Sequence, residues 1–70
     1  MNYKEIDKTK FYVLNEVLAI FREFGLPSSR ASFFSMKKDG TIPEKYLSLF
    51  TKGKHIRIKG DNLIKLLKEL

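Results

Sequence analysis

Eight basic side chains between residues 28 and 59 are the groups whose type and spacing point most directly to chemistry. Only Asp39 and Glu44 are acidic in this segment, so it carries a net charge of +6. The rest of the chain holds six basic and six acidic residues and is neutral. Such a concentration of positive charge attracts polyanions, chiefly nucleic acid or an anionic membrane surface. The eight residues are Arg30, Lys37, Lys38, Lys45, Lys52, Lys54, Arg57 and Lys59.

Catalytic and metal-binding chemistry has few groups to build on. The 70 residues include no cysteine and one histidine, His55, which no Ser–His–acid pattern or metal-ligand spacing surrounds. A chain of this length forms one small domain without a deep cleft. We therefore expect no enzyme, no metal and no cofactor, and we interpret His55 as facing solvent or phosphate.

The basic segment must be presented by a small set of elements. Apolar residues recur at helical spacing from Leu14 to Phe24, and Gly25 with a following proline ends this helix. Ser28 or Ser29, with Ser29 favoured, caps a second helix of about ten residues. Gly40 and Pro43 are placed to end that helix.

A β-hairpin and a last helix follow in the sequence. Residues 46–50 and 55–59 are rich in aromatic and β-branched residues, and residues 51–54 separate them as a turn. Asp61 is the predicted cap of a last helix, whose apolar face is Leu63, Leu66, Leu67 and Leu70. The predicted fold class is α+β and mostly helical, in the order helix, helix, hairpin, helix over residues 12–70. Residues 1–11 are expected to form a loosely ordered lead.

The second helix is the predicted reading element. At 100° per residue, Phe33 and Met36 lie on its inner side and a mixed polar set on its outer side. A helix about 15 Å long on a basic surface fits the major groove of B-DNA, which is about 12 Å wide. Phe34 either packs beneath the hairpin or contacts a base or sugar. The candidate DNA-binding residues are Ser29, Arg30, Ala31, Phe34, Ser35, Lys37 and Lys38 on this helix, with Lys52, Lys54, His55 and Arg57 on the hairpin.

Five sequence blocks resemble a known family in their order and spacing. Residues 12–17 (YVLNEV), 29–34 (SRASFF), 40–43 (GTIP), 52–58 (KGKHIRI) and 61–63 (DNL) are similar to the excisionase-type, MerR-like winged helix-turn-helix family, over about residues 12–69. Val13 departs from the family, which often has a serine or threonine cap there. The resemblance implies a small DNA-binding protein of a phage or mobile element, whose second helix reads the major groove and whose wing contacts the backbone or minor groove. Some members are recombination directionality factors that bend DNA beside an integrase, and others are transcriptional regulators.

The leading interpretation is a sequence-specific, excisionase-like protein that binds double-stranded DNA, and the alternative is a small prophage-type transcriptional regulator with the same surface. We expect a cytoplasmic, nucleoid-associated monomer that assembles cooperatively on DNA, with an integrase or other recombination protein as a partner and no membrane contact. The sequence shows no signal-peptide pattern at its start and no apolar stretch of membrane-spanning length.

Three other interpretations stay open. In the first, the last helix docks on a protein partner through Leu63, Ile64 and Leu67, and the positive charge serves solubility. In the second, the basic hairpin residues keep an exposed strand edge from pairing, and the charged side of the second helix is simply solvated. Binding to a membrane surface ranks last, because the helices with the best apolar faces are charge-neutral.

Overall fold

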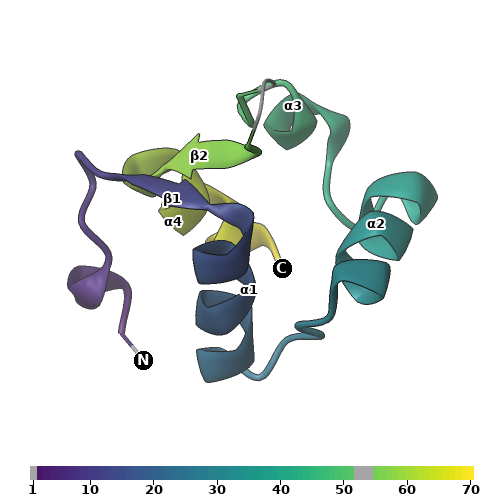
Figure 1. Ribbon diagram of the computed structural model, residues 1–70, viewed down its shortest axis with the longest axis horizontal. Helices are drawn as coiled ribbons and strands as arrows, with labels where there is room; N and C mark the ends of the chain where they lie inside the picture. The colour runs from purple at the N-terminus through teal and green to yellow at the C-terminus, as the bar shows by residue number, and fades with distance from the viewer. Residues whose placement is uncertain (1, 52–54) are drawn as a thin grey trace.

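The computed structural model of the protein describes residues 2–51 and 55–70. In this part of the chain, four α-helices and a two-stranded sheet follow a short 3-10 turn. The elements are η1 (Tyr3–Glu5), β1 (Phe11–Val13), α1 (Leu14–Glu23), α2 (Arg30–Asp39), α3 (Glu44–Leu47), β2 (Arg57–Lys59) and α4 (Gly60–Glu69). The sheet lies against α1 and α4, while α2 stands on the side away from the N-terminal segment (Figure 1). The predicted α+β, mostly helical class is confirmed.

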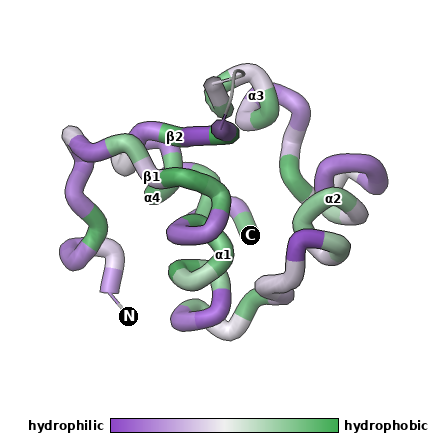
Figure 2. The backbone as a smooth tube through the Cα atoms, in the orientation of Figure 1, coloured by the Kyte–Doolittle hydropathy of each residue, from purple (hydrophilic) through white to green (hydrophobic). Residues whose placement is uncertain are grey.

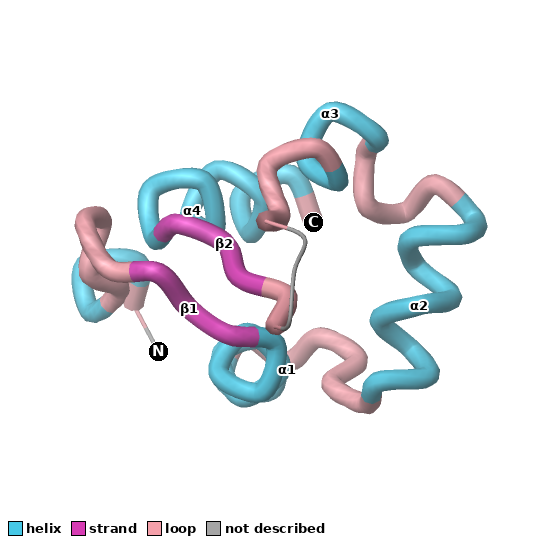
Figure 3. The backbone as a smooth tube through the Cα atoms, turned by 45° about the horizontal axis from the view of Figure 1, so that its top comes forward, coloured by secondary structure: helices cyan, strands magenta, loops and turns pink. Residues whose placement is uncertain are grey.

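The two strands come from distant parts of the chain and run antiparallel beside each other (Figure 3). Their register pairs Phe11 with Lys59, Tyr12 with Ile58 and Val13 with Arg57. Side chains alternate between the two faces of a sheet, and here Tyr12 and Ile58 face the core at 8% and 0% exposure. On the opposite face, Phe11, Arg57 and Lys59 are exposed and Val13 is half-buried.

The predicted first strand of the hairpin is wrong. Residues 46–50 form the end of α3 and a turn, in which Tyr46 and Phe50 are both buried. Side chains four residues apart lie on the same side of a helical turn, so this spacing carries both rings into the core. The predicted second strand contains β2, but the partner of β2 is β1. Within the described residues, the bridge between Thr51 and Arg57 is the one pairing that follows the predicted hairpin, and Lys52 and Lys54 lie outside those residues.

The first helix begins and ends where the sequence predicts. Val13 at its N-cap has no side-chain oxygen to offer, but Glu16 Oε1 accepts the backbone N–H of Val13 at 3.1 Å. This one contact fixes the first turn of α1, as the returning glutamate does in a capping box. At the other end, Gly25 takes the left-handed conformation with φ of 74°, which ends the helix.

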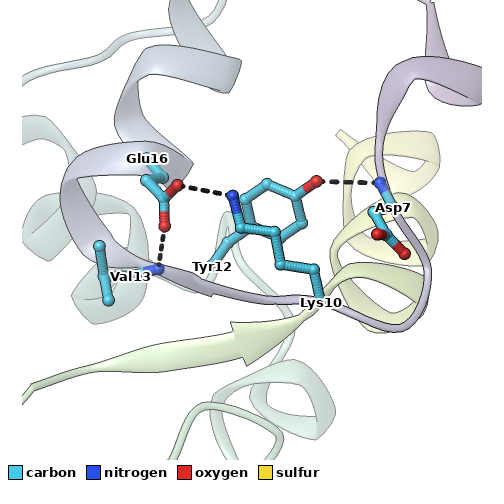
Figure 4. Close-up of polar contacts among 5 residues, drawn as sticks. All are labelled: Asp7, Lys10, Tyr12, Val13 and Glu16. Atoms are coloured by element: carbon cyan, nitrogen blue, oxygen red, sulfur yellow. Dashed lines mark hydrogen bonds and ion pairs between the residues drawn. The ribbon is translucent and has the colours of Figure 1, made fainter.

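The N-terminal segment packs onto the rest of the molecule. Residues 1–11 were expected to be a loosely ordered lead, whereas Ile6 is 3% exposed and belongs to the core. The backbone N–H of Asp7 donates to the Tyr12 hydroxyl at 2.9 Å, and Lys10 Nζ contacts Glu16 Oε2 at 3.0 Å (Figure 4). These contacts link the segment to β1 and to the first turn of α1.

The last helix begins one residue before its predicted cap. Lys59 is the N-cap of α4 and offers no side-chain hydrogen bond, so the assignment of Asp61 as the cap is wrong. Gly60 passes so close to the backbone of Asp7 that an added Cβ would lie 1.8 Å from the carbonyl oxygen of Asp7. Its N–H also donates to the carbonyl oxygen of Lys10 at 2.8 Å. Only glycine fits this close approach, at the point where β2 passes directly into α4.

The apolar face of α4 is buried in the core of the protein. Leu63, Ile64 and Leu67 are 0%, 7% and 4% exposed, and all three belong to the core. Ile64 therefore belongs to the buried face of the helix together with Leu63 and Leu67. This face is not available to a protein partner in the folded chain.

Candidate nucleic-acid interface

The inner and outer sides of α2 are divided as the sequence predicts. Phe33 and Met36 are 1% and 7% exposed, and the Phe33 ring packs near Phe21 of α1 and near Phe50, with centroids 6.3 and 5.7 Å apart. The outer side carries exposed Arg30, Ala31, Phe34, Ser35 and Lys38. In Figure 2 both ends of α2 are hydrophilic and its middle is hydrophobic, so polar groups are concentrated where the helix starts and stops.

Both ends of α2 are fixed by the predicted residues. Ser29 is its N-cap, and Ser29 Oγ accepts the N–H of Ser32 at 3.0 Å and donates to Ser32 Oγ at 2.8 Å. Gly40 ends the helix in the left-handed conformation with φ of 86°. The Ser29 hydroxyl, a candidate DNA contact, is therefore engaged in holding the helix start.

Arg30 connects the beginnings of the two long helices that flank the candidate interface. Its Nη2 donates to Asn15 Oδ1 at 2.7 Å, from the first turn of α2 to the first turn of α1. Arg30, Asn15 and His55 also line one open pocket of about 390 Å³, with Val13 and Ile56 among its other lining residues. The structure thus brings together Arg30 and His55, which are 25 positions apart in the sequence. The guanidinium keeps further N–H donors beyond the one that Asn15 uses.

Phe34 is partly packed and partly open. Its ring stands edge-on to Phe33 at 5.7 Å between centroids, yet 45% of the residue is exposed. Lys37 Nζ lies 5.2 Å from the Phe34 centroid and 5.9 Å from that of Phe33. Lys37 is half-buried and lines a second pocket of about 350 Å³ together with Glu44. Its charge is directed over the rings and toward this pocket, in contrast to the exposed Arg30.

Two described residues of the predicted hairpin extend the exposed surface of α2. His55 and Arg57 are both exposed. Arg57 lies opposite Val13 in the sheet, and Val13 also lines the pocket that Arg30 and His55 share. The exposed basic surface therefore runs from α2 through the pocket to β2.

Ion pairing leaves most of this surface positively charged. Lys45 Nζ contacts Glu69 Oε1 at 2.9 Å, and this hydrogen bond raises the pKa of Lys45. At the end of α2, hydrogen bonds from the hydroxyl and N–H of Thr41 lower the pKa of Asp39. Within residues 2–51 and 55–70, no carboxylate forms an ion pair with Arg30, Lys38, Arg57 or Lys59.

The sequence did not single out three residues that the structure makes relevant to binding. Asn15 is an ordinary helical residue in the sequence, and only the fold shows that it holds Arg30. Phe11 was assigned to the lead, although Phe11, Tyr12 and Val13 form a run of high β-propensity that could have indicated a strand. Lys59 lies in the predicted second strand, residues 55–59, but was not included among the candidate contacts.

Comparison of the chain with protein-family models, curated proteins and solved structures gave no match. In the part of the chain that the structure describes, no helix has the length and apolar character needed to cross a membrane. The same residues contain no group of three or more acidic or histidine side chains arranged to hold a metal ion.

Proposed function

We propose that this chain is a sequence-specific protein that binds double-stranded DNA, with α2 in the major groove. The observation that carries the proposal is the outer side of α2. It is exposed, it is free of carboxylates over its first nine residues, and it offers cationic, hydroxyl, methyl and aromatic groups. These are the groups that contact phosphates and the edges of bases.

The dimensions of the molecule suit one short site. Ten residues make α2 about 15 Å long, which fits a groove about 12 Å wide. The molecule measures 29 × 27 × 20 Å, and one turn of B-DNA is about 34 Å long. One copy thus covers less than a turn, and a longer site requires several copies side by side, in line with a monomer that assembles cooperatively on DNA.

The residues that flank α2 supply the phosphate contacts in this proposal. Arg30 and His55 share a pocket at the start of α2, and Lys38 is exposed near its end. Arg57 extends the positive surface onto β2. Contacts to phosphates on both sides of the reading helix would fix its register in the groove.

The biological role in the proposal comes from the sequence resemblance. The helix pair with an antiparallel two-stranded sheet is compatible with a winged helix. We favour an excisionase-like recombination directionality factor that acts beside an integrase. Transcriptional regulation uses the same surface and differs in the DNA sites that are bound.

The salt dependence of duplex binding tests this proposal. The affinity for a fluorescein-labelled duplex pool is measured by anisotropy at several salt concentrations. Removal of one phosphate contact in Arg30→Ala or Lys38→Ala should reduce the logarithmic salt slope by about 1. Lys65→Ala removes an exposed charge from α4 and should leave the slope unchanged. Equal slopes for all four proteins would contradict the proposal.

A further inference from the structure

The solvent face of the two-stranded sheet carries an aromatic ring among cations. Phe11 is 50% exposed, more than any other large hydrophobic residue in the described part of the chain. Its partner across the strands is Lys59, and the next pair on this face is Val13 with Arg57. Lys59 and Arg57 are both exposed. Directly paired side chains lie about 5 Å apart at Cβ, so Lys59 borders the ring, and Arg57 is the diagonal neighbour on the same face.

The described part of the chain leaves half of Phe11 uncovered. Among the described residues, Phe11 has no aromatic partner, whereas Phe33 packs with three other rings. Phe11 is half exposed, so part of its side chain remains accessible to a ligand. An open ring bordered by cations is complementary to a nucleotide, whose base stacks on the ring and whose phosphate contacts a cation.

We propose that this sheet face is a second site, which binds single-stranded DNA. Phe11 stacks on one base, and Lys59, its partner across the strands, contacts a flanking phosphate. The strand must be single because base faces inside a duplex are covered by their neighbours. We assign the site to DNA because Thr51, the residue bridged to Arg57, already donates its hydroxyl proton to the Arg57 carbonyl oxygen at 3.2 Å and does not offer that proton to a ribose 2′-hydroxyl.

The position of this face allows it to act together with α2. In Figures 1 and 3, β1 begins on the side of the molecule away from α2. A duplex against α2 and a single strand against the start of β1 therefore need not compete. The inference goes beyond the proposed function and does not depend on it.

A comparison of two oligonucleotides tests the stacking contact. The probes are a fluorescein-labelled oligothymidylate of about ten nucleotides and an abasic oligonucleotide of equal length. The unmodified protein should bind the thymidylate about tenfold more tightly, and Phe11→Ala should bind both probes equally. Phe11→Trp should restore the preference, because it restores a stacking ring.

Matched variants separate this site from the duplex site. Phe34→Ala removes a ring of similar exposure from α2 and should leave the oligothymidylate affinity unchanged. Lys59→Ala should reduce the salt slope for the oligothymidylate by about 0.7, whereas Lys65→Ala should not. Phe11→Ala should remain folded, which circular dichroism checks, and should retain the duplex affinity of the unmodified protein. Loss of duplex binding alone would therefore contradict the proposed function and leave the single-strand site intact.

Several outcomes would overturn the inference. One is an equal loss of affinity for both probes in Phe11→Ala, and another is the absence of any preference for the thymidylate in the unmodified protein. Tighter binding of an oligouridylate would assign the face to RNA. Competition by a short polyglutamate peptide as strong as by the oligonucleotide would assign it to an acidic protein segment.

Discussion

The Arg30 guanidinium donates a hydrogen bond to Asn15 Oδ1 at 2.7 Å, so the first turn of α2 is tied to the first turn of α1. Arg30 is an exposed residue with a long side chain, and the bond restricts the positions that its charge can occupy. Restricting a side chain before binding lowers the entropy that binding costs. In the proposed complex, Asn15 is therefore a positioning residue for Arg30.

Replacement of Asn15 should weaken DNA binding less than replacement of Arg30. Arg30→Ala removes the charge and should weaken duplex binding about tenfold, whereas Asn15→Ala removes one hydrogen bond and should weaken it about threefold. The two effects should not add in the double variant, because they act through the same guanidinium. Titrations of all three variants against one duplex test this, and fully additive losses would contradict it.

The cap of α2 should contribute measurably to stability. Ser29→Ala removes the oxygen that accepts the Ser32 N–H and should lower the free energy of unfolding by about 1 kcal/mol. Ser28→Ala is the matched control, because Ser28 is not the cap residue. Urea unfolding of both variants gives the comparison. An equal loss of unfolding free energy in the two variants would contradict the role of Ser29 as the stabilising cap of α2.

The helices could be predicted from the sequence because each has a local signal. Leu14, Val17, Leu18 and Phe21 repeat at helical spacing, and Ser29 and Gly40 bound α2 as glycine and serine commonly do. The division of α2 into an inner and an outer side followed from the same periodicity. The candidate contacts on this helix could therefore be chosen from the sequence.

The strand pairing could not be predicted from the sequence, because it is long-range. β1 and β2 are three residues each and are separated by 43 residues, so neither contains a pattern that identifies the other. The spacing of Tyr46 and Phe50 is compatible with a strand and with a helical turn. In the structure they lie in a helical turn, which buries both rings in the core. The contact between Asn15 and Arg30 and the open face around Phe11 depend on this pairing and packing.

Gly60 should tolerate no side chain. In Gly60→Ala, the new Cβ would lie 1.8 Å from the Asp7 carbonyl oxygen, and the N-terminal segment would have to move. We expect a loss of about 2–4 kcal/mol in the free energy of unfolding. Gly40→Ala has free space but a positive φ of 86°, and should lose only about 1–2 kcal/mol. A smaller loss for Gly60→Ala than for Gly40→Ala would contradict the packing of the N-terminal segment.

Glu16 should account for part of the stability that the protein loses at acidic pH. Its pKa is lowered by the hydrogen bond from the Val13 N–H and then by Lys10. A carboxylate whose folded-state pKa is lowered stabilises the fold above its unfolded-state pKa, and this stabilisation is lost as the pH falls through the folded-state value. Melting curves recorded from neutral pH downward should therefore show a decline that Glu16→Gln makes shallower by a few degrees.

The control for this acid dependence is Glu23→Gln. Glu23 is exposed and has no ion pair within the described residues, so its replacement should leave the decline unchanged. Glutamine at position 16 can still accept the Val13 N–H, and α1 should keep its start at neutral pH. An identical acid decline in the unmodified protein and in Glu16→Gln would show that Glu16 does not contribute.

Selection of binding sites from random duplexes tests most directly the claim that the outer side of α2 reads DNA. Bound duplexes are enriched and sequenced for the unmodified protein, for Ser35→Ala and Phe34→Ala on the outer side of α2, and for Lys65→Ala on α4. The account predicts that one short motif is enriched, that the two α2 variants relax it at specific positions, and that Lys65→Ala leaves it unchanged. Enrichment of no motif, or of the same motif by all four proteins, would contradict the claim.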